Sequence, residues 1–174
     1  MKKMFVMMMA VVLMLMSSVG GASAEEYSVG FMLVEINGTE YFLDQEESSG
    51  TNSSNRTNLR FVCRDAYDNI LFSIYLRFGD GISVGTTTTN YGGQPVSITL
   101  CDRTAGYTTY RAKKDKQYSS SLNINYSYDI GYLEMYVDEK LDDGNFYSGY
   151  FGAVLEQEDG YGEIEIIGGF VAEI

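Results

Sequence analysis

The chain has 174 residues and a formal net charge of −12, with 15 tyrosines but no histidine and no tryptophan. Without histidine it can form neither a Ser-His-Asp triad nor a histidine-ligated metal site. Its negative charge repels phosphate backbones and anionic lipids, so we expect no nucleic-acid partner. The charge is compatible with cations, basic proteins or neutral glycans.

Residues 1–24 have the organisation of a secretory signal peptide. Lys2 and Lys3 precede the apolar run Met4–Met16, and the small-residue triplet Ala22-Ser23-Ala24 follows it. This order predicts cleavage before Glu25 and no membrane attachment afterwards. We therefore expect a bacterial protein that is secreted, or periplasmic, with residues 25–174 forming a single acidic domain.

The rest of the chain alternates apolar and polar residues with a period of two and is rich in Tyr, Phe, Ile, Val and Thr, which favours β-strands. Turn formers such as Asn37-Gly38 and Asp159-Gly160 separate the segments. The pattern predicts an antiparallel β-sandwich of about nine or ten strands, with a closed β-barrel as the alternative. The expected strands are 27–36, 40–44, 59–65, 70–78, 95–101, 107–112, 119–128, 132–138, 146–157 and 162–174, with a short extended piece at 82–84.

Two segments between these strands are expected to be irregular. Residues 45–58 are polar and of low complexity, which predicts a flexible surface loop. The run KKDKQ at 113–117 predicts a charged turn.

Cys63 and Cys101 are the two cysteines of the chain. In an exported protein an even pair usually forms one disulfide, so we expect a Cys63–Cys101 bond. Cys63 shares the inward parity of Leu59 and Phe61, whereas Cys101 is out of phase with Leu100. Two free thiols are therefore the alternative.

The acidic residues near the C-terminus raise three chemical possibilities. Glu163 and Glu165 lie two apart on one strand, at a spacing that overlaps that of glycoside hydrolysis, but alternate acids also occur on any solvated strand face. Asp142, Asp143 and Asn145 offer oxygen ligands for a weak calcium site. The glutamates are also explained as the solvent-exposed face of a strand, and the aspartates and asparagine as turn formers. We therefore expect no enzyme activity, no metal and no cofactor.

The third possibility is a binding face. If strands 132–138, 146–157 and 162–174 are neighbours, their outward side chains form one patch. Tyrosine rings stack on sugars or protein surfaces, and carboxylates accept hydrogen bonds from hydroxyl groups. The expected members are Tyr132, Glu134, Tyr136, Tyr150, Glu163 and Glu165.

Two stretches carry a resemblance to a known group of proteins. They are LFSIYLRFGDGISVGTTTTNY and the closing YLEMYVDEKLDDGNFYSGYFGAVLEQEDGYGEIEIIGGFVAEI. Through their glycine and aromatic spacing, both are similar to exported β-sandwich proteins of gut bacteria, whose function is not known. The chain lacks the lipid-attachment cysteine that many of these carry, and the resemblance implies only fold and export.

The sequence therefore predicts a secreted, non-enzymatic β domain that binds an extracellular glycan or protein. A structural or assembly module of the cell surface is one alternative. A small glycan hydrolase using Glu163 or Glu165 is another.

Overall fold

The computed structural model describes residues 30–51, 56–88, 96–104, 106–119, 121, 124–141 and 146–174. The regular elements of these residues are eleven antiparallel strands, which confirms the all-β prediction. They are β1 (Phe31–Ile36), β2 (Thr39–Thr51), β3 (Arg56–Arg64), β4 (Ile70–Phe78), β5 (Gly85–Thr88), β6 (Val96–Asp102), β7 (Thr108–Ser119), β8 (Ile124–Ile130), β9 (Tyr132–Leu141), β10 (Phe146–Gln157) and β11 (Glu163–Glu173).

Eight of the strands close into a barrel. Neighbours run in the order β10-β11-β1-β2-β3-β4-β6-β7, and β7 then pairs with β10 through Glu156↔Arg111 and Gln157↔Tyr110. The barrel alternative is therefore confirmed, and the β-sandwich prediction is wrong. Alternation with period two gives the same inward and outward residues in both architectures. The β7–β10 contact that distinguishes them joins segments far apart in the sequence.

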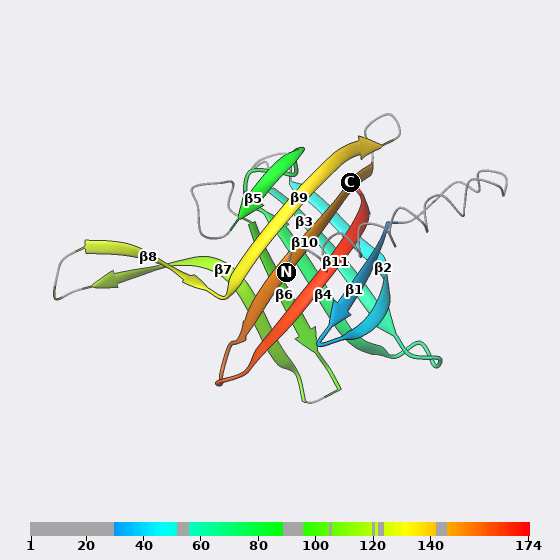
Figure 1. Ribbon diagram of the computed structural model, residues 1–174, viewed down its shortest axis with the longest axis horizontal. Coiled ribbons are helices and arrows are strands. Elements are labelled where there is room, and N and C mark those ends of the chain that lie inside the picture. Colours follow the sequence, from blue (N-terminus) through cyan, green and yellow to red (C-terminus); the bar gives the residue numbers. More distant parts are fainter. Residues whose placement is uncertain are drawn as a thin grey trace.

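The other three strands extend the wall of the barrel. β9 pairs with the first part of β10, from Phe146 to Val154, and β5 pairs with the outer edge of β9. Beyond Ala112, β7 leaves β6 and pairs with β8 instead. Figure 1 shows this β7–β8 hairpin projecting sideways from the barrel.

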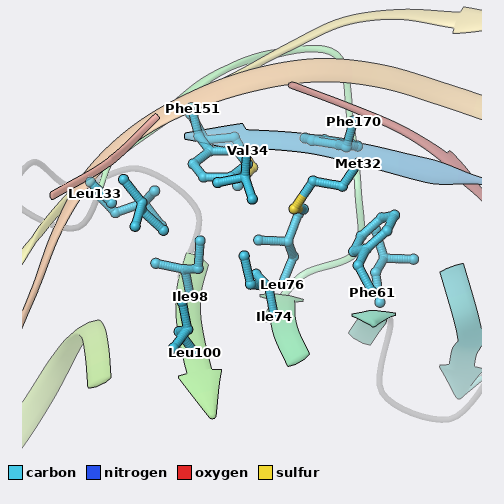
Figure 2. Close-up of a cluster of buried hydrophobic side chains, with 14 of the residues drawn as sticks. Met32, Val34, Phe61, Ile74, Leu76, Ile98, Leu100, Leu133, Phe151 and Phe170 are labelled. Carbon is cyan, nitrogen blue, oxygen red and sulfur yellow. The ribbon is translucent and has the colours of Figure 1, made fainter. Parts of the chain in front are cut away.

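The barrel interior is filled with apolar side chains, as expected for eight strands, whose interior is just wide enough for them. Figure 2 shows Met32, Val34 and Phe151 meeting Ile74 and Ile98 from the opposite wall. The largest side chains under 2% exposed are Phe61, Phe151, Met32, Leu43, Leu59, Ile74, Leu76, Ile98, Leu133, Met135, Leu155 and Ile166. Because the core occupies the interior, the surfaces open to a binding partner are the outside of the wall and the turns.

Two phenylalanines and two glycines interlock where β10 meets β11. In the strand register Phe151 is opposite Gly168, and Phe170 is opposite Gly149. A Cβ at Gly168 would lie 2.7 Å from the Phe151 ring, and one at Gly149 would lie 2.8 Å from the Phe170 ring. Each glycine therefore makes room for the ring of the opposite strand.

Two sequence predictions of irregular structure are wrong. The loop expected at 45–58 is mostly strand, because β2 continues to Thr51 and β3 begins at Arg56; residues 52–55 lie outside the described part. The turn expected at 113–117 lies within β7. In both places pairing with the neighbouring strand outweighs the weak β-propensity of Ser, Gly, Asn and Lys.

Candidate functional site

The structure brings four of the six predicted binding residues together on β9 and β10. Tyr136 is directly opposite Tyr150, with ring centroids 5.2 Å apart and planes tilted by 39°. The Tyr132 hydroxyl donates a hydrogen bond of 2.9 Å to Glu134 Oε2. The fully buried Leu133 and Met135 alternate with these residues, so the four point outward. We call Tyr132, Glu134, Tyr136 and Tyr150 the tyrosine face.

Beside the tyrosine face, glycines leave the outer surface of the sheet without side chains. Gly152 is opposite Glu134, and Gly169 on β11 is opposite Tyr150. A Cβ placed on Gly152 would have no other atom within 4 Å, so the space above this backbone is open. The result is a strip of bare main chain next to an aromatic pair and a carboxylate. In Figure 1 the strands that carry it, β9, β10 and β11, run side by side as yellow, orange and red ribbons.

Burial and neighbouring charges both act on the Tyr150 phenol. Partial burial raises the pKa of this phenol above its ordinary value, and the neighbouring Tyr136, Asp138 and Glu134 raise it further. A phenol is already protonated at neutral pH, and the raised pKa extends that range upward, so the hydroxyl can donate a hydrogen bond. Together with the Glu134 carboxylate, the face offers a donor, an acceptor and two ring surfaces.

The remaining two predicted residues lie on β11, toward the end of the barrel where the β10–β11 turn lies. Glu165 is opposite Val154, which is itself opposite Tyr132, so Glu165 borders the tyrosine face. Glu163 is opposite Glu156 and lies beyond the face. Both Glu163 and Glu165 are exposed. Their outward position on an open wall adds no support for hydrolysis.

Sequence reasoning missed three tyrosines at one end of the barrel. Tyr67, Tyr107 and Tyr161 are 86%, 75% and 111% exposed and lie in the β3–β4, β6–β7 and β10–β11 turns. Backbone hydrogen bonds join these turns, from Arg103 N to Leu71 O and from Glu158 N to Thr109 O. A large aromatic residue this exposed, among the Asp, Asn and Gly of a turn, has no part in the apolar core. That mismatch was the signal in the sequence.

The Asp65 carboxylate accepts several of the hydrogen bonds that hold the Tyr67 turn. Asp65 accepts hydrogen bonds from the backbone N–H groups of Tyr67 and Asn69, at 2.8 and 2.9 Å, and from the Asn69 side chain. The Asn69 side-chain hydrogen bond is the largest cause of an Asp65 pKa below its ordinary value, and the two backbone hydrogen bonds add to it. Together with the backbone hydrogen bonds from Asp65 N to Asn69 O and from Asp68 N to Asp65 O, these contacts present Tyr67 in a defined position.

The predicted Cys63–Cys101 disulfide is not formed, and both cysteines are free. Cys63 on β3 is opposite Phe72 and points into the core, whereas Cys101 on β6 is opposite Ser73 and points outward. Strand β4 lies between them. Two strand spacings put the Cα atoms roughly 10 Å apart, beyond the ~7 Å that a disulfide spans. The out-of-phase position of Cys101 in the sequence was the correct signal.

The metal prediction falls outside the described part of the chain, because Asp142, Asp143 and Asn145 lie in the gap at 142–145. Among the described residues, no group of three or more His, Cys, Asp or Glu side chains is placed to hold a metal ion. No helix in that same part is long and apolar enough to cross a membrane.

The chain was compared with protein families, curated proteins and solved structures. No protein-family model, no curated protein and no solved structure matches the chain.

Proposed function

We propose that this chain is an exported, non-enzymatic protein that binds a glycan or a protein outside the cell through its tyrosine face. The observation that supports this most is the outward-facing Tyr136–Tyr150 pair beside the bare main chain at Gly152. Flat rings next to an open, flat surface suit the apolar face of a sugar ring or an aromatic-rich protein surface. The Glu134 carboxylate is placed to accept hydrogen bonds from hydroxyl groups.

A screen of the purified protein against a glycan array, followed by titration of the hits, tests this proposal. We expect Tyr136→Ala to weaken binding about tenfold, which corresponds to about 1.4 kcal/mol of lost stacking. The matched control is Tyr75→Ala, since Tyr75 is a half-buried outward tyrosine on β4, on the opposite wall. Circular dichroism checks that both variants keep the fold. Equal affinities for Tyr136→Ala and Tyr75→Ala would contradict the proposal.

The same titrations identify the surface that is used. Tyr161→Ala removes the most exposed tyrosine of the turn end. Lost binding in Tyr161→Ala with unchanged binding in Tyr136→Ala would move the site to the turns. Release of soluble sugar, abolished by Glu165→Gln, would replace binding with the hydrolase alternative.

A further inference from the structure

The charges of the barrel are divided between its two halves. The outward positions of β3, β4 and β7 carry five arginines, which we call the arginine wall: Arg56, Arg60, Arg64, Arg77 and Arg111. Among the described residues, the outward positions of β3, β4 and β6 carry no carboxylate. A protein with a net charge of −12 therefore presents one positive side.

The positive charge of the arginine wall is only partly neutralised within the molecule. Glu46 pairs with both Arg60, at 2.9 Å, and Arg64, and Asp68 also pairs with Arg64, at 3.3 Å. Arg111 pairs with Glu158 at 2.7 Å. Arg77 is exposed and has no ion pair with a described residue. The wall thus keeps an excess of positive charge.

The opposite half of the barrel carries the reverse charge. Its outward carboxylates near the β1–β2 and β10–β11 turns form what we call the acidic belt: Glu35, Glu40, Glu163 and Glu165. No lysine or arginine occurs in the described residues of β11, β1 and β2. Figure 1 views this half from the front, with β10, β11 and β1 before β4 and β6.

Carboxylates of the acidic belt are directly opposite other carboxylates at two places. Glu35 is directly opposite Glu40, and Glu163 is directly opposite Glu156. Like charges at directly opposite positions destabilise an antiparallel pair. None of the four belt residues has an ion pair with a described residue. A cationic surface docked on the belt would relieve this repulsion.

We propose that copies of this chain associate head to tail, with the arginine wall of one copy on the acidic belt of the next. Each copy carries both complementary surfaces, so no other partner is required. The rim of the acidic belt includes Phe42, which is 55% exposed and is the kind of aromatic residue that is enriched at interfaces. Because the two surfaces lie on opposite walls, the contact is heterologous and leads to open chains or rings rather than a two-fold dimer.

Ionic strength distinguishes this contact from apolar association. Net negative charge repels copies at long range, but a Debye length of about 10 Å at 0.1 M salt screens that repulsion while contacting pairs remain attractive. Light scattering of the purified protein is expected to show a mass that rises with concentration at about 0.1 M salt. At about 1 M salt, where the Debye length is ~3 Å, the monomer is expected.

Neutral substitutions then locate the contact. Arg77→Gln, and the double change Glu35→Gln with Glu40→Gln, are each expected to weaken association about tenfold or more. The matched controls are Arg103→Gln and Glu139→Gln, which remove exposed charges outside the two surfaces and are expected to have no effect. When the two variants are mixed, the intact acidic belt of Arg77→Gln can bind the intact arginine wall of the double glutamate variant. Because the other two surfaces are defective, a dimer that does not grow further is expected.

Three results would overturn the proposal. They are a monomer at every concentration at about 0.1 M salt, association that strengthens with salt, and association unchanged by Arg77→Gln. Since the tyrosine face is not part of the contact, Tyr136→Ala is expected to leave self-association intact. Failure of the binding proposal is thereby distinguished from failure of this one.

Discussion

At the scale of single residues, Gly131 illustrates how one position determines the shape of the wall. It joins β8 to β9 with a φ of 62°, a left-handed conformation that favours glycine. A Cβ there would lie 2.3 Å from the Val154 carbonyl oxygen and 3.0 Å from that of Arg111. Both obstacles are backbone atoms of β10 and β7, so a side chain would push the barrel open where it closes.

We therefore predict that Gly131→Ala lowers the free energy of unfolding by about 2 kcal/mol or more, through strain and displaced backbone. Gly152→Ala is the matched control, because its Cβ would meet no other atom within 4 Å. Denaturant unfolding measures both. Similar losses in the two variants would show that the crowding at Gly131 is unimportant.

The inward or outward direction of side chains along a strand was predictable from the sequence. The exposed aromatic side chains of the turns were not. Alternation correctly placed Leu133 and Met135 inward and Tyr136 outward, since the period of two is a property of any strand. The turn tyrosines Tyr67 and Tyr161 were overlooked because the turn formers around them were interpreted for backbone geometry alone.

At the scale of elements, the β7–β10 seam is the weakest part of the barrel wall. It consists of two register pairs, one backbone hydrogen bond from Glu158 N to Thr109 O at 2.8 Å, and the Arg111–Glu158 ion pair. By contrast, the β10–β11 ladder runs from Phe146 to Glu156 without a break. Local opening starts where few hydrogen bonds must be broken.

We predict that the Glu158 amide exchanges its hydrogen faster than amides in the middle of β10 and β11, as measured by NMR. Arg111→Gln removes the exposed ion pair, worth at most about 1 kcal/mol, and is expected to speed exchange at the seam only. Uniform protection across the barrel would contradict a weak seam.

Most strands were predictable as elements, but their lengths were not. β4 and β10 agree with the ranges expected from alternation, because their own side chains carry the signal. β2 and β7 run further than their composition suggests. Their extensions depend on partners, Arg56–Arg64 for β2 and Ile124–Ile130 for β7, and single-segment propensity contains no information about a partner.

At the scale of the whole molecule, the closed barrel is stabilised without a covalent link. Cys63 and Cys101 are separated by β4, and burial together with the charge of Asp44 raises the pKa of the Cys63 thiol. The expected disulfide would have contributed roughly 3–4 kcal/mol. Stability instead comes from the filled interior, where residues such as Phe61 and Phe151 are at most 1% exposed.

We predict that a reducing agent leaves the melting temperature unchanged and that the intact mass corresponds to two thiols. At pH 8 an alkylating agent is expected to modify Cys101 before Cys63, since burial and the raised pKa make the Cys63 thiolate scarce. A mass lighter by two hydrogens, or a melting temperature that falls on reduction, would establish the bond instead.

The sequence could not distinguish a sandwich from a barrel, for the same physical reason that it could not predict the strand lengths. Both architectures bury Leu155, Ile166 and Phe170, so the hydrophobic pattern is satisfied by either. The difference depends on whether β7 reaches β10, which is determined by the bend of the whole wall.

The packing of phenylalanine rings against glycines between β10 and β11 also has a consequence for recognising distant homologues. Each strand contains a Gly-x-Phe triplet, Gly149-Tyr150-Phe151 and Gly168-Gly169-Phe170, and antiparallel pairing sets the first glycine of each triplet opposite the phenylalanine of the other. Enlarging one member requires shrinking the other, so the four positions should vary together through descent. Two Gly-x-Phe triplets on successive strands form a fingerprint that can outlast similarity along the rest of the chain.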